Sequence, residues 1–241
     1  MRHMRRPESR HRLQAQSAGE RVVIVGTGEQ AAIAFEYLTR DSPHEVIAFS
    51  AEPEFLCSDV YCGLPVVPLS ELAAAYPPAA HRAFVAVSAT QLNRIRRRLL
   101  DQVKEAGFRC ISYVSSKAFA WHNVAIGENT FVFEHSVLQH RARVGDNVIL
   151  WTGSSVAHQS VIEDDCYVAP HAAIAGFCRV GSGSFVGIGS CVADTVSVAR
   201  DCVIGAGAVV IKDTKPRQVY VGNPARATGR DSFETFSVAA I

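Results

Sequence analysis

The sequence lacks a charge excess, a long apolar run and any paired-cysteine motif. Lys+Arg 24 stand against Asp+Glu 23 in 241 residues, which gives no basic footprint for nucleic acid. No stretch reaches the ~18 uncharged apolar residues of a membrane span. The seven cysteines are odd in number and form no CxxC pair, so a reducing cytoplasm is favoured over a disulfide framework.

The first 20 residues are basic but have no apolar core, so they are not a secretory signal. We predict that residues 1–20 are a flexible extension. A hydrophobic fraction of 48% and a charged fraction of 20% are ordinary for a globular protein. The chain is therefore predicted to be cytoplasmic, with neither nucleic acid nor membrane as a partner.

A six-residue repeat runs through the second half of the chain. Every sixth residue from Ile126 to Val210 is Ile, Leu or Val, and the position two residues earlier, from Thr130 to Ala208, holds only small side chains. A period of six is neither helical nor that of a simple strand. It indicates one short strand and one corner per hexapeptide, with three hexapeptides closing a triangular coil of 18 residues. Repeats of this type form left-handed parallel β-helices.

The repeat also explains several glycines and cysteines. Five coils are expected over residues 124–213, and the glycines that follow the aliphatic position are expected to relieve strain at the corners; these are Gly127, Gly145, Gly181, Gly187 and Gly205. Cys166, Cys178 and Cys202 occupy the small inward position, where a free cysteine acts as a small hydrophobe. We predict that these three are structural.

The first half alternates strands with helices. Strands are expected at 21–28, 45–50, 84–88 and 110–114, helices at 31–40 and 90–107, and a short strand and helix start at 64–72. This order predicts a small, Rossmann-like parallel α/β domain over residues 21–108.

A glycine-rich turn, Gly26-Thr27-Gly28, follows the first of these strands. Its N–H groups suit a phosphate. Ser50 stands where a dinucleotide site would have an acidic residue, which weighs against NAD. The diphosphate or sugar of a nucleotide-linked ligand and a tight turn without a ligand both stay open.

This arrangement resembles the sialic-acid O-acetyltransferase-like family of sugar acyltransferases, which includes N-acetyltransferases of nucleotide-linked 4-amino sugars. The most specific stretches are Trp151 to Ile162 (WTGSSVAHQSVI), Ala175-Gly176, Gly187-Ile188, Gly205 to Asp213, and Val221 to Arg226. The resemblance implies an acceptor-binding Rossmann-like domain (21–108), a left-handed β-helix acyltransferase domain (109–213) and a C-terminal segment (214–241) that caps the helix and contacts coenzyme. It also implies acetyl-CoA as co-substrate, no metal and a homotrimer.

The family also implies roles for individual residues. His158 matches the general base, and Gln159 stands where an acidic residue commonly follows it. Gly176 and Ile188 match backbone contacts to the coenzyme, Tyr167 replaces a histidine near the thioester carbonyl, and Ala206 matches a small residue against the coenzyme. The remaining matches form the acceptor-nucleotide cradle: Gly26, Thr27, Gly28, Ser50 and Ala51.

The residue types fit acyl transfer. His158 lies at a corner and is expected to point outward, where its imidazole can take a proton near neutral pH. A backbone N–H near Gly176, one coil above, is the expected oxyanion donor, and His140, one coil below, is a candidate to bind the acceptor or polarise His158. Lys212 and Arg226, with Lys215 and Arg217, are candidates for the coenzyme phosphates.

We therefore predict an acetyl-CoA-dependent acyltransferase that acts on the amino group of a nucleotide-linked amino sugar. A sugar hydroxyl is the second choice of acceptor. Two other classes stay open: a zinc carbonic-anhydrase-like β-helix protein, and a non-catalytic nucleotide-binding scaffold, which the uncharged Gln159 keeps in consideration.

Overall fold

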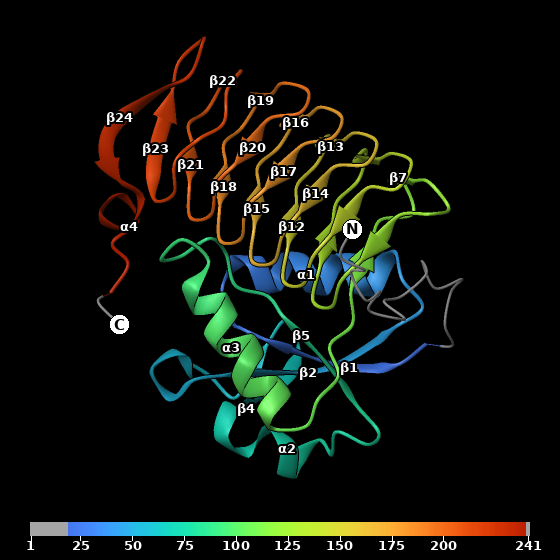
Figure 1. The fold of residues 1–241 in the computed structure, drawn as a ribbon. Helices are drawn as coiled ribbons and strands as arrows, with labels where there is room; N and C mark the ends of the chain where they lie inside the picture. The colour runs from blue at the N-terminus through green and yellow to red at the C-terminus, as the bar shows by residue number, and fades with distance from the viewer. Residues whose placement is uncertain (1–18, 240–241) are drawn as a thin grey trace, which may run out of the picture.

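The computed structural model describes residues 19–239, so nearly all of the predicted extension at 1–20 lies outside the described residues. An α/β region comes first, and a triangular prism of short strands lies above it (Figure 1). No helix within residues 19–239 is both long and apolar enough to cross a membrane.

The α/β region is built on a five-stranded sheet with β1 (Arg21–Val25) beside its centre. The strand order is β3-β4-β2-β1-β5, and all neighbours are parallel except β3 and β4. The other strands are β2 (Glu45–Ala51), β3 (Val60–Tyr61), β4 (Leu64–Pro68) and β5 (Arg82–Val85). The strands predicted at 21–28, 45–50, 64–72 and 84–88 are present, and the antiparallel edge strand β3 is an addition that the sequence did not indicate.

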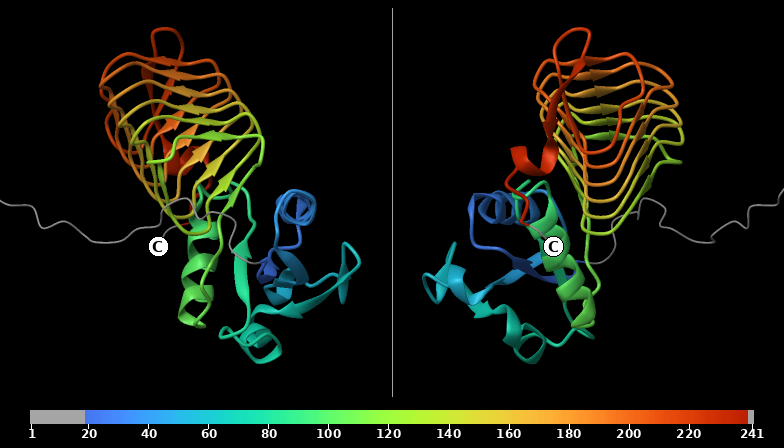
Figure 2. Two further views of the ribbon diagram at one scale, coloured as in Figure 1. Left: turned by 90° about the vertical axis from the view of Figure 1, so that its right-hand side faces the viewer. Right: turned by 60° about the vertical axis from the view of Figure 1, so that its left-hand side comes forward.

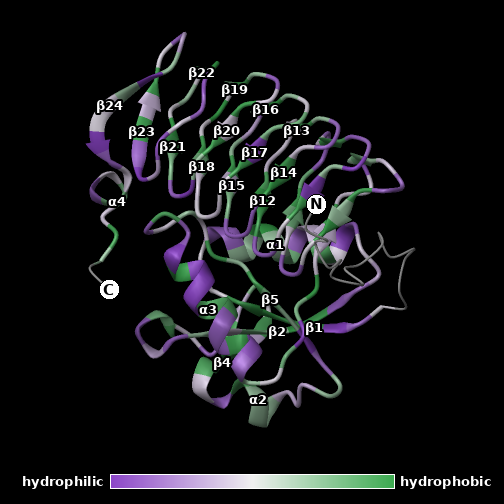
Figure 3. Cartoon of the chain, viewed as in Figure 1, coloured by the Kyte–Doolittle hydropathy of each residue, from purple (hydrophilic) through white to green (hydrophobic). Residues whose placement is uncertain are grey.

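Helices cover both faces of this sheet. Alternate residues of β1 face opposite sides: Val22 and Ile24 pack with α1 (Glu29–Arg40), and Val23 and Val25 pack with α2 (Leu72–Ala75) and α3 (Arg94–Glu105). Two single 3₁₀ turns, Pro53–Phe55 and Leu69–Glu71, complete the region. Hydrophobic residues mark the central strands, and hydrophilic residues are prominent along α3 (Figure 3).

Seventeen two-residue strands form the three faces of the prism, each face a parallel ladder. The first face contains β7 (Phe119–Ala120), β10 (Val137–Leu138), β13 (Ser155–Val156), β16 (Ala173–Ile174), β19 (Cys191–Val192) and β22 (Val209–Val210). The second contains β8 (Ala125–Ile126), β11 (Arg143–Val144), β14 (Val161–Ile162), β17 (Arg179–Val180) and β20 (Ser197–Val198). The third contains β6 (Tyr113–Val114), β9 (Phe131–Val132), β12 (Ile149–Leu150), β15 (Tyr167–Val168), β18 (Phe185–Val186) and β21 (Val203–Ile204).

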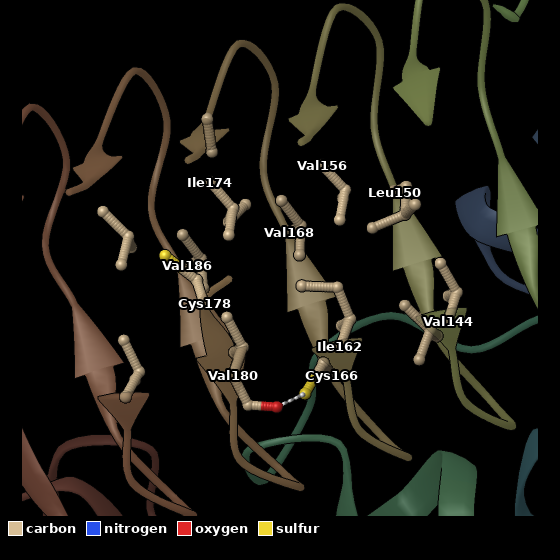
Figure 4. Close-up of a cluster of buried hydrophobic side chains, with 14 of the residues drawn as sticks. Val144, Leu150, Val156, Ile162, Cys166, Val168, Ile174, Cys178, Val180 and Val186 are labelled. Atoms are coloured by element: carbon tan, nitrogen blue, oxygen red, sulfur yellow. Dashed lines mark hydrogen bonds between the residues drawn. The ribbon is translucent and has the colours of Figure 1, made fainter. Parts of the chain in front are cut away.

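Both predicted registers fill the interior of the prism. The aliphatic residues from Val132 to Val210 are buried, and so are the small residues from Thr130 to Ala208. Figure 4 shows Cys166 and Cys178 among these aliphatic side chains. Burial raises the pKa of the Cys166 thiol far above its ordinary value, so the thiol stays protonated, as the structural interpretation requires.

The backbone at the corners shows that the glycines after the aliphatic position have a different role from the expected one. The residue with positive φ lies three positions after the aliphatic one, as at Gln159 (φ 57) and Phe177 (φ 56), which is the position that favours glycine in a type II turn. Gly127 and Gly145 do not have positive φ. A Cβ at either would approach the next coil to 2.2 or 2.3 Å, so these glycines allow close stacking of the coils rather than relief of corner strain.

The predicted strand at 110–114 is divided between the two regions. Cys110 forms a bridge with Ala83 beside β5, whereas Tyr113 and Val114 pair with β9 of the prism. At the other end, β23 (Gln218–Val221) extends the third face beyond β21, and β24 (Arg226–Asp231) pairs antiparallel with it. The short helix α4 (Ser232–Thr235) follows.

The third face of the prism rests on the α/β region (Figure 2). Its aromatic side chains stack along the prism: the ring centroids of Phe131 and Phe133 are 4.1 Å apart, and those of Phe133 and Trp151 are 4.2 Å apart. Tyr37 of α1 meets Phe133 edge-on and donates a hydrogen bond to Glu134 at 2.8 Å.

The helix α3 lies along the corner between the second and third faces, here called the α3 corner. Arg96 is 1% exposed and donates to the carbonyl oxygen of Asn147 at 2.6 Å and to its Oδ1 at 3.0 Å. Asn147 donates in turn to Asp165, which also accepts from Arg97. Burial, opposed by the charge of Asp165, lowers the pKa of Arg96 to about 10. This network fixes the prism on the α/β region.

Candidate active site

His158 lies at the corner between the first and second faces, which we call the histidine corner. Residues 18 apart stack there in one column: His122, His140, His158, Gly176, Asp194 and Lys212. This corner is opposite the third face, so it lies away from the chain's own α/β region. His158 is exposed, as predicted.

Neighbouring coils hold the backbone of His158 in place. Its N–H donates to Oε1 of Gln139 at 3.2 Å, and its carbonyl accepts from the N–H of Phe177 at 3.0 Å. The imidazole meets the Phe177 ring edge-on, with centroids 5.0 Å apart. Within residues 19–239 no hydrogen bond reaches the ring nitrogens of His158, so the imidazole is positioned by packing and is available to a substrate.

Gly176 provides the space in which this imidazole lies. A Cβ at Gly176 would be 2.5 Å from Cε1 of His158 and 2.7 Å from its Nε2, distances shorter than any real contact of a Cβ. Gly176 does not have positive φ, so the requirement for glycine is steric. The sequence pointed to the backbone of this residue, but not to the role of its missing side chain.

The N–H of Gly176 is not free to stabilise an oxyanion. It donates to Oδ1 of Asp194 at 2.9 Å, so the oxyanion donor expected near Gly176 would be another backbone N–H. Asp194 lies one coil further along the same column and was not singled out by the sequence analysis. The period of 18 residues, applied from His158 and Gly176, would have found it.

His140 and Gln159 flank His158 without contacting its ring. Nδ2 of Asn123 donates to Nδ1 of His140 at 3.0 Å, which orients that imidazole. The backbone N–H of Gln159 donates to the carbonyl of His140 at 2.9 Å, while its exposed side chain makes no hydrogen bond within the described part of the chain. Neither residue supplies a negative charge to His158.

Tyr167 does not lie beside His158 in the same chain. It belongs to β15 on the third face, where its ring stacks on Phe185 with centroids 5.1 Å apart and packs against the α/β region. The expected position near the thioester at His158 is therefore not met within one chain. Burial raises the pKa of Tyr167, so its phenol stays protonated near neutral pH.

Two of the expected coenzyme contacts lie at a different corner from Gly176. Ile188 and Ala206 are exposed at the corner between the third and first faces, which we call the Ile188 corner. The first face separates them from Gly176. One chain therefore presents the expected coenzyme contacts as two separate groups.

The candidate cations lie near the C-terminal end of the prism. Lys212 ends the histidine column, and Arg226 begins β24; both are exposed and form no ion pair with a described residue. Arg217 is engaged elsewhere, since it pairs with Asp231 at 2.9 Å and lies over the Phe233 ring.

The predicted nucleotide cradle is assembled by the sheet. The turn Gly26-Thr27-Gly28 joins β1 to α1, and Gly26 (φ +127) donates its N–H to the carbonyl of Ser50 at 2.8 Å. No side chain caps the N-terminus of α1. The Ser50 hydroxyl is buried and unpaired within the described residues, and Ala51 beside it is buried.

An acidic residue does follow the second strand, two positions after Ser50. Glu52 accepts two hydrogen bonds from Arg98 of α3, at 2.5 and 2.8 Å. The Arg98 guanidinium holds the pKa of Glu52 below its ordinary value. The sequence did not indicate this pair. Both carboxylate oxygens of Glu52 accept from Arg98, so they are already engaged and are not free to bind the hydroxyls of a ribose.

No group of three or more metal-ligating side chains is assembled within residues 19–239.

A profile of the bacterial transferase hexapeptide (six repeats) matches residues 141–176, which include His158 and Gly176.

Solved structures of sugar acetyltransferases have the same fold over nearly the whole chain. The acetyltransferase domain of PglB from Neisseria gonorrhoeae is 25% identical, with 87% of this chain and 100% of that one covered and a TM-score of 0.78; it was also solved with acetyl coenzyme A. PerB from Caulobacter crescentus, in complex with CoA and GDP-perosamine, is 28% identical; the match covers 90% of this chain and 100% of PerB, with a TM-score of 0.77.

A third structure, WeeI from Acinetobacter baumannii, shares the fold at 20% identity, with 86% of this chain and 98% of that one covered and a TM-score of 0.73. The repeat profile and the two sets of sugar acetyltransferase structures confirm the resemblance predicted from the sequence. The chain is an acyltransferase that is similar to these acetyltransferases of hexapeptide-repeat, left-handed β-helix fold.

Proposed function

We propose that this acyltransferase moves an acetyl group from acetyl-CoA to the amino group of a nucleotide-linked amino sugar. The observation that carries the proposal is the exposed imidazole of His158, seated over Gly176 at a corner that the chain's own α/β region leaves uncovered. Its relatives support the same chemistry, since PerB was solved with CoA and GDP-perosamine and another similar structure is that of a perosamine N-acetyltransferase.

His158 acts as general base in this proposal. Its imidazole removes a proton from the amine as the nitrogen attacks the thioester carbonyl carbon. A C–N bond forms, the C–S bond breaks, and the proton passes from the imidazolium to the departing thiolate. Direct attack of this kind requires no metal and no acyl-enzyme.

The active site is proposed to form between two protomers of a homotrimer. Gly176 lies at the histidine corner and Ile188 and Ala206 at the Ile188 corner, so one coenzyme can reach all three only if the corners belong to different chains. Ile188 is 53% exposed and Phe177 is 54% exposed, and large apolar side chains of this kind favour burial. A closed threefold ring brings the two corners together at every interface.

In such a groove Gly176, Ile188 and Ala206 are the proposed coenzyme contacts. Lys212 and Arg226 are the proposed partners of its phosphates because they are unpaired cations in the described part of the chain. His140 and Gln159 are proposed to contact the acceptor beside His158.

We assign the nucleotide to the α/β domain, which we interpret as Rossmann-like. Its parallel strands run outward from β1 to β2 and β4, and the chain then returns to β5 on the other side of β1. Ligands of open α/β sheets bind where the strand order reverses in this way. Gly26, Thr27 and Gly28 lie at that point beside Ser50 and Ala51, and the uncapped N-terminus of α1 suits a phosphate. The cytoplasmic location stays a prediction.

The direct test is a mass screen of the full chain with acetyl-CoA and GDP-, UDP- and dTDP-linked amino sugars, with the matching hydroxy sugars as controls. We expect one acetyl group on an amino sugar and free CoA in equal amount. Acetylation of the hydroxy sugars alone would replace the amine by the hydroxyl acceptor. Coenzyme binding without turnover on any acceptor would support a scaffold instead.

The shared site is tested by mixing two inactive variants. His158→Ala damages the histidine corner, and Ile188→Glu damages the Ile188 corner. If each site takes one corner from each of two chains, trimers refolded or coexpressed from equal amounts regain about one quarter of the wild-type sites. A mixture as inactive as its components, or an active monomer, would contradict the shared groove.

A further inference from the structure

The histidine column contains one negative charge, and it lies on the far side of Gly176 from His158. Oδ1 of Asp194 is 3.2 Å from the position that a Cβ of Gly176 would take, and Nε2 of His158 is 2.7 Å from the same point. The two side chains therefore converge on one glycine and lie within about 6 Å of each other, a range over which opposite charges stabilise one another.

No other group in the column can supply this charge. His140 lies one coil below His158, and Lys212 lies one coil beyond Asp194; both are cationic when protonated. The residue that follows His158 is the neutral Gln159, whose side chain makes no hydrogen bond within residues 19–239. An imidazolium formed at His158 would have Asp194 as its nearest anion in the column.

We propose that Asp194 is a positioning residue that stabilises the imidazolium of His158 as it takes the proton from the acceptor. The hydrogen bond from the Gly176 N–H to Oδ1 holds the carboxylate in place at 2.9 Å. The interaction gains strength where a neighbouring protomer excludes water from the groove. This inference rests on the proposed function, because it concerns the same base.

A purely structural role for Asp194 is the competing explanation, and the chain contains a matched control for it. Asp164 accepts a hydrogen bond from the N–H of Asp146 at 2.8 Å, one coil away in the same manner as Asp194 and Gly176. That pair lies at the α3 corner, remote from any imidazole. Asp164→Asn and Asp194→Asn both keep an acceptor oxygen for the backbone N–H and remove only the charge.

The first experiment measures kcat and KM with acetyl-CoA and the amino sugar that the wild-type chain accepts. We expect Asp194→Asn to lower kcat about 10-fold, with both KM values within about twofold of wild type, and Asp164→Asn to leave kcat unchanged. Gln159→Glu added to Asp194→Asn should recover most of the lost turnover, because it returns a negative charge beside His158 while the amide oxygen introduced by Asp194→Asn still accepts the hydrogen bond from Gly176. Wild-type kcat in Asp194→Asn, an equal loss in Asp164→Asn, or no recovery with Gln159→Glu would each overturn the proposal.

A second measurement needs no acceptor, so it separates this inference from the proposed function. Diethyl pyrocarbonate modifies neutral imidazole, and peptide mass spectrometry gives the rate at His158 relative to His171 in the same molecule. At pH 6 we expect His158 to react about threefold faster in Asp194→Asn than in wild type or Asp164→Asn, because the stabilising charge is gone. Equal rates in all three proteins would show that Asp194 does not act on His158, whether or not the wild-type chain acetylates a sugar.

Discussion

The α3 corner and the histidine corner are built by the same repeat, but they differ in what covers them. Both use an aspartate to accept a backbone N–H from the preceding coil: Asp164 from Asp146, and Asp194 from Gly176. At the α3 corner Arg96 fills the space outside the coil with a buried guanidinium that donates two hydrogen bonds to Asn147. At the histidine corner that space holds an exposed imidazole. The same repeat thus builds both corners. The corner that α3 covers stabilises the fold, and the corner that stays uncovered presents a reactive side chain.

The reactive role of the histidine corner is tested most directly by removing the imidazole of His158. We expect His158→Ala to lower turnover by about 10²-fold or more, because no other group is placed to take the acceptor proton. Thermal unfolding should be unchanged, since the side chain is exposed and its backbone contacts remain. Turnover near the wild-type level would remove His158 from the mechanism.

The opposite result is expected at the α3 corner. Arg96→Met should reduce the free energy of unfolding by about 3 kcal/mol, because it leaves the buried carbonyl of Asn147 without its side-chain donor and leaves Oδ1 of Asn147 with Asn129 alone. Chemical denaturation measures this, and kcat per folded molecule should stay unchanged. Lys104→Met is the matched control on the same helix: its ion pair with Glu128 is partly exposed, so the loss should be below about 1 kcal/mol. Equal losses in the two variants would contradict the role given to Arg96.

Gly176→Ala sharpens the comparison, because it adds one methyl group at the histidine corner. The new Cβ would meet Cε1 of His158 at 2.5 Å, so the imidazole must rotate away and kcat should fall about 10-fold. The ring is a side chain with room to move, so the unfolding temperature should change little. Combined with His158→Ala, the substitution should cause no further loss of kcat at saturating acetyl-CoA; a further loss of kcat would show that Gly176 acts on the chemical step through something other than the imidazole.

The smallest effect is expected at the Glu52–Arg98 pair, which belongs to neither corner. The folded state holds the pKa of Glu52 below its ordinary value. The pair therefore stabilises the protein fully when the pH is above the unfolded pKa of Glu52, about 4.3. This contribution is lost as the pH falls through the lower pKa that Glu52 has in the folded protein. Arg98 is largely exposed, so Arg98→Ala should cost at most about 1 kcal/mol at neutral pH. The difference in stability between variant and wild type should vanish at low pH. A difference that persists there would show that Arg98 stabilises the protein through packing rather than through its charge.

The sequence by itself determined the prism. Its period of six requires each aliphatic and each small residue to face inward, so the core, the strands and the outward position of His158 follow from local spacing. Alternating strands and helices likewise gave the elements of the α/β region. These features depend on residues close together in the chain.

Only the tertiary structure decided which corner is covered and what lies beside each side chain. Tyr167 was expected near the thioester at His158, yet it lies half-buried on the third face and packs against the α/β region. An oxyanion donor was expected near Gly176, and the structure shows that the N–H of Gly176 itself donates to Asp194. Such contacts join residues 18 or more apart through stacking and docking, whose energies depend on three-dimensional packing rather than on spacing along the chain.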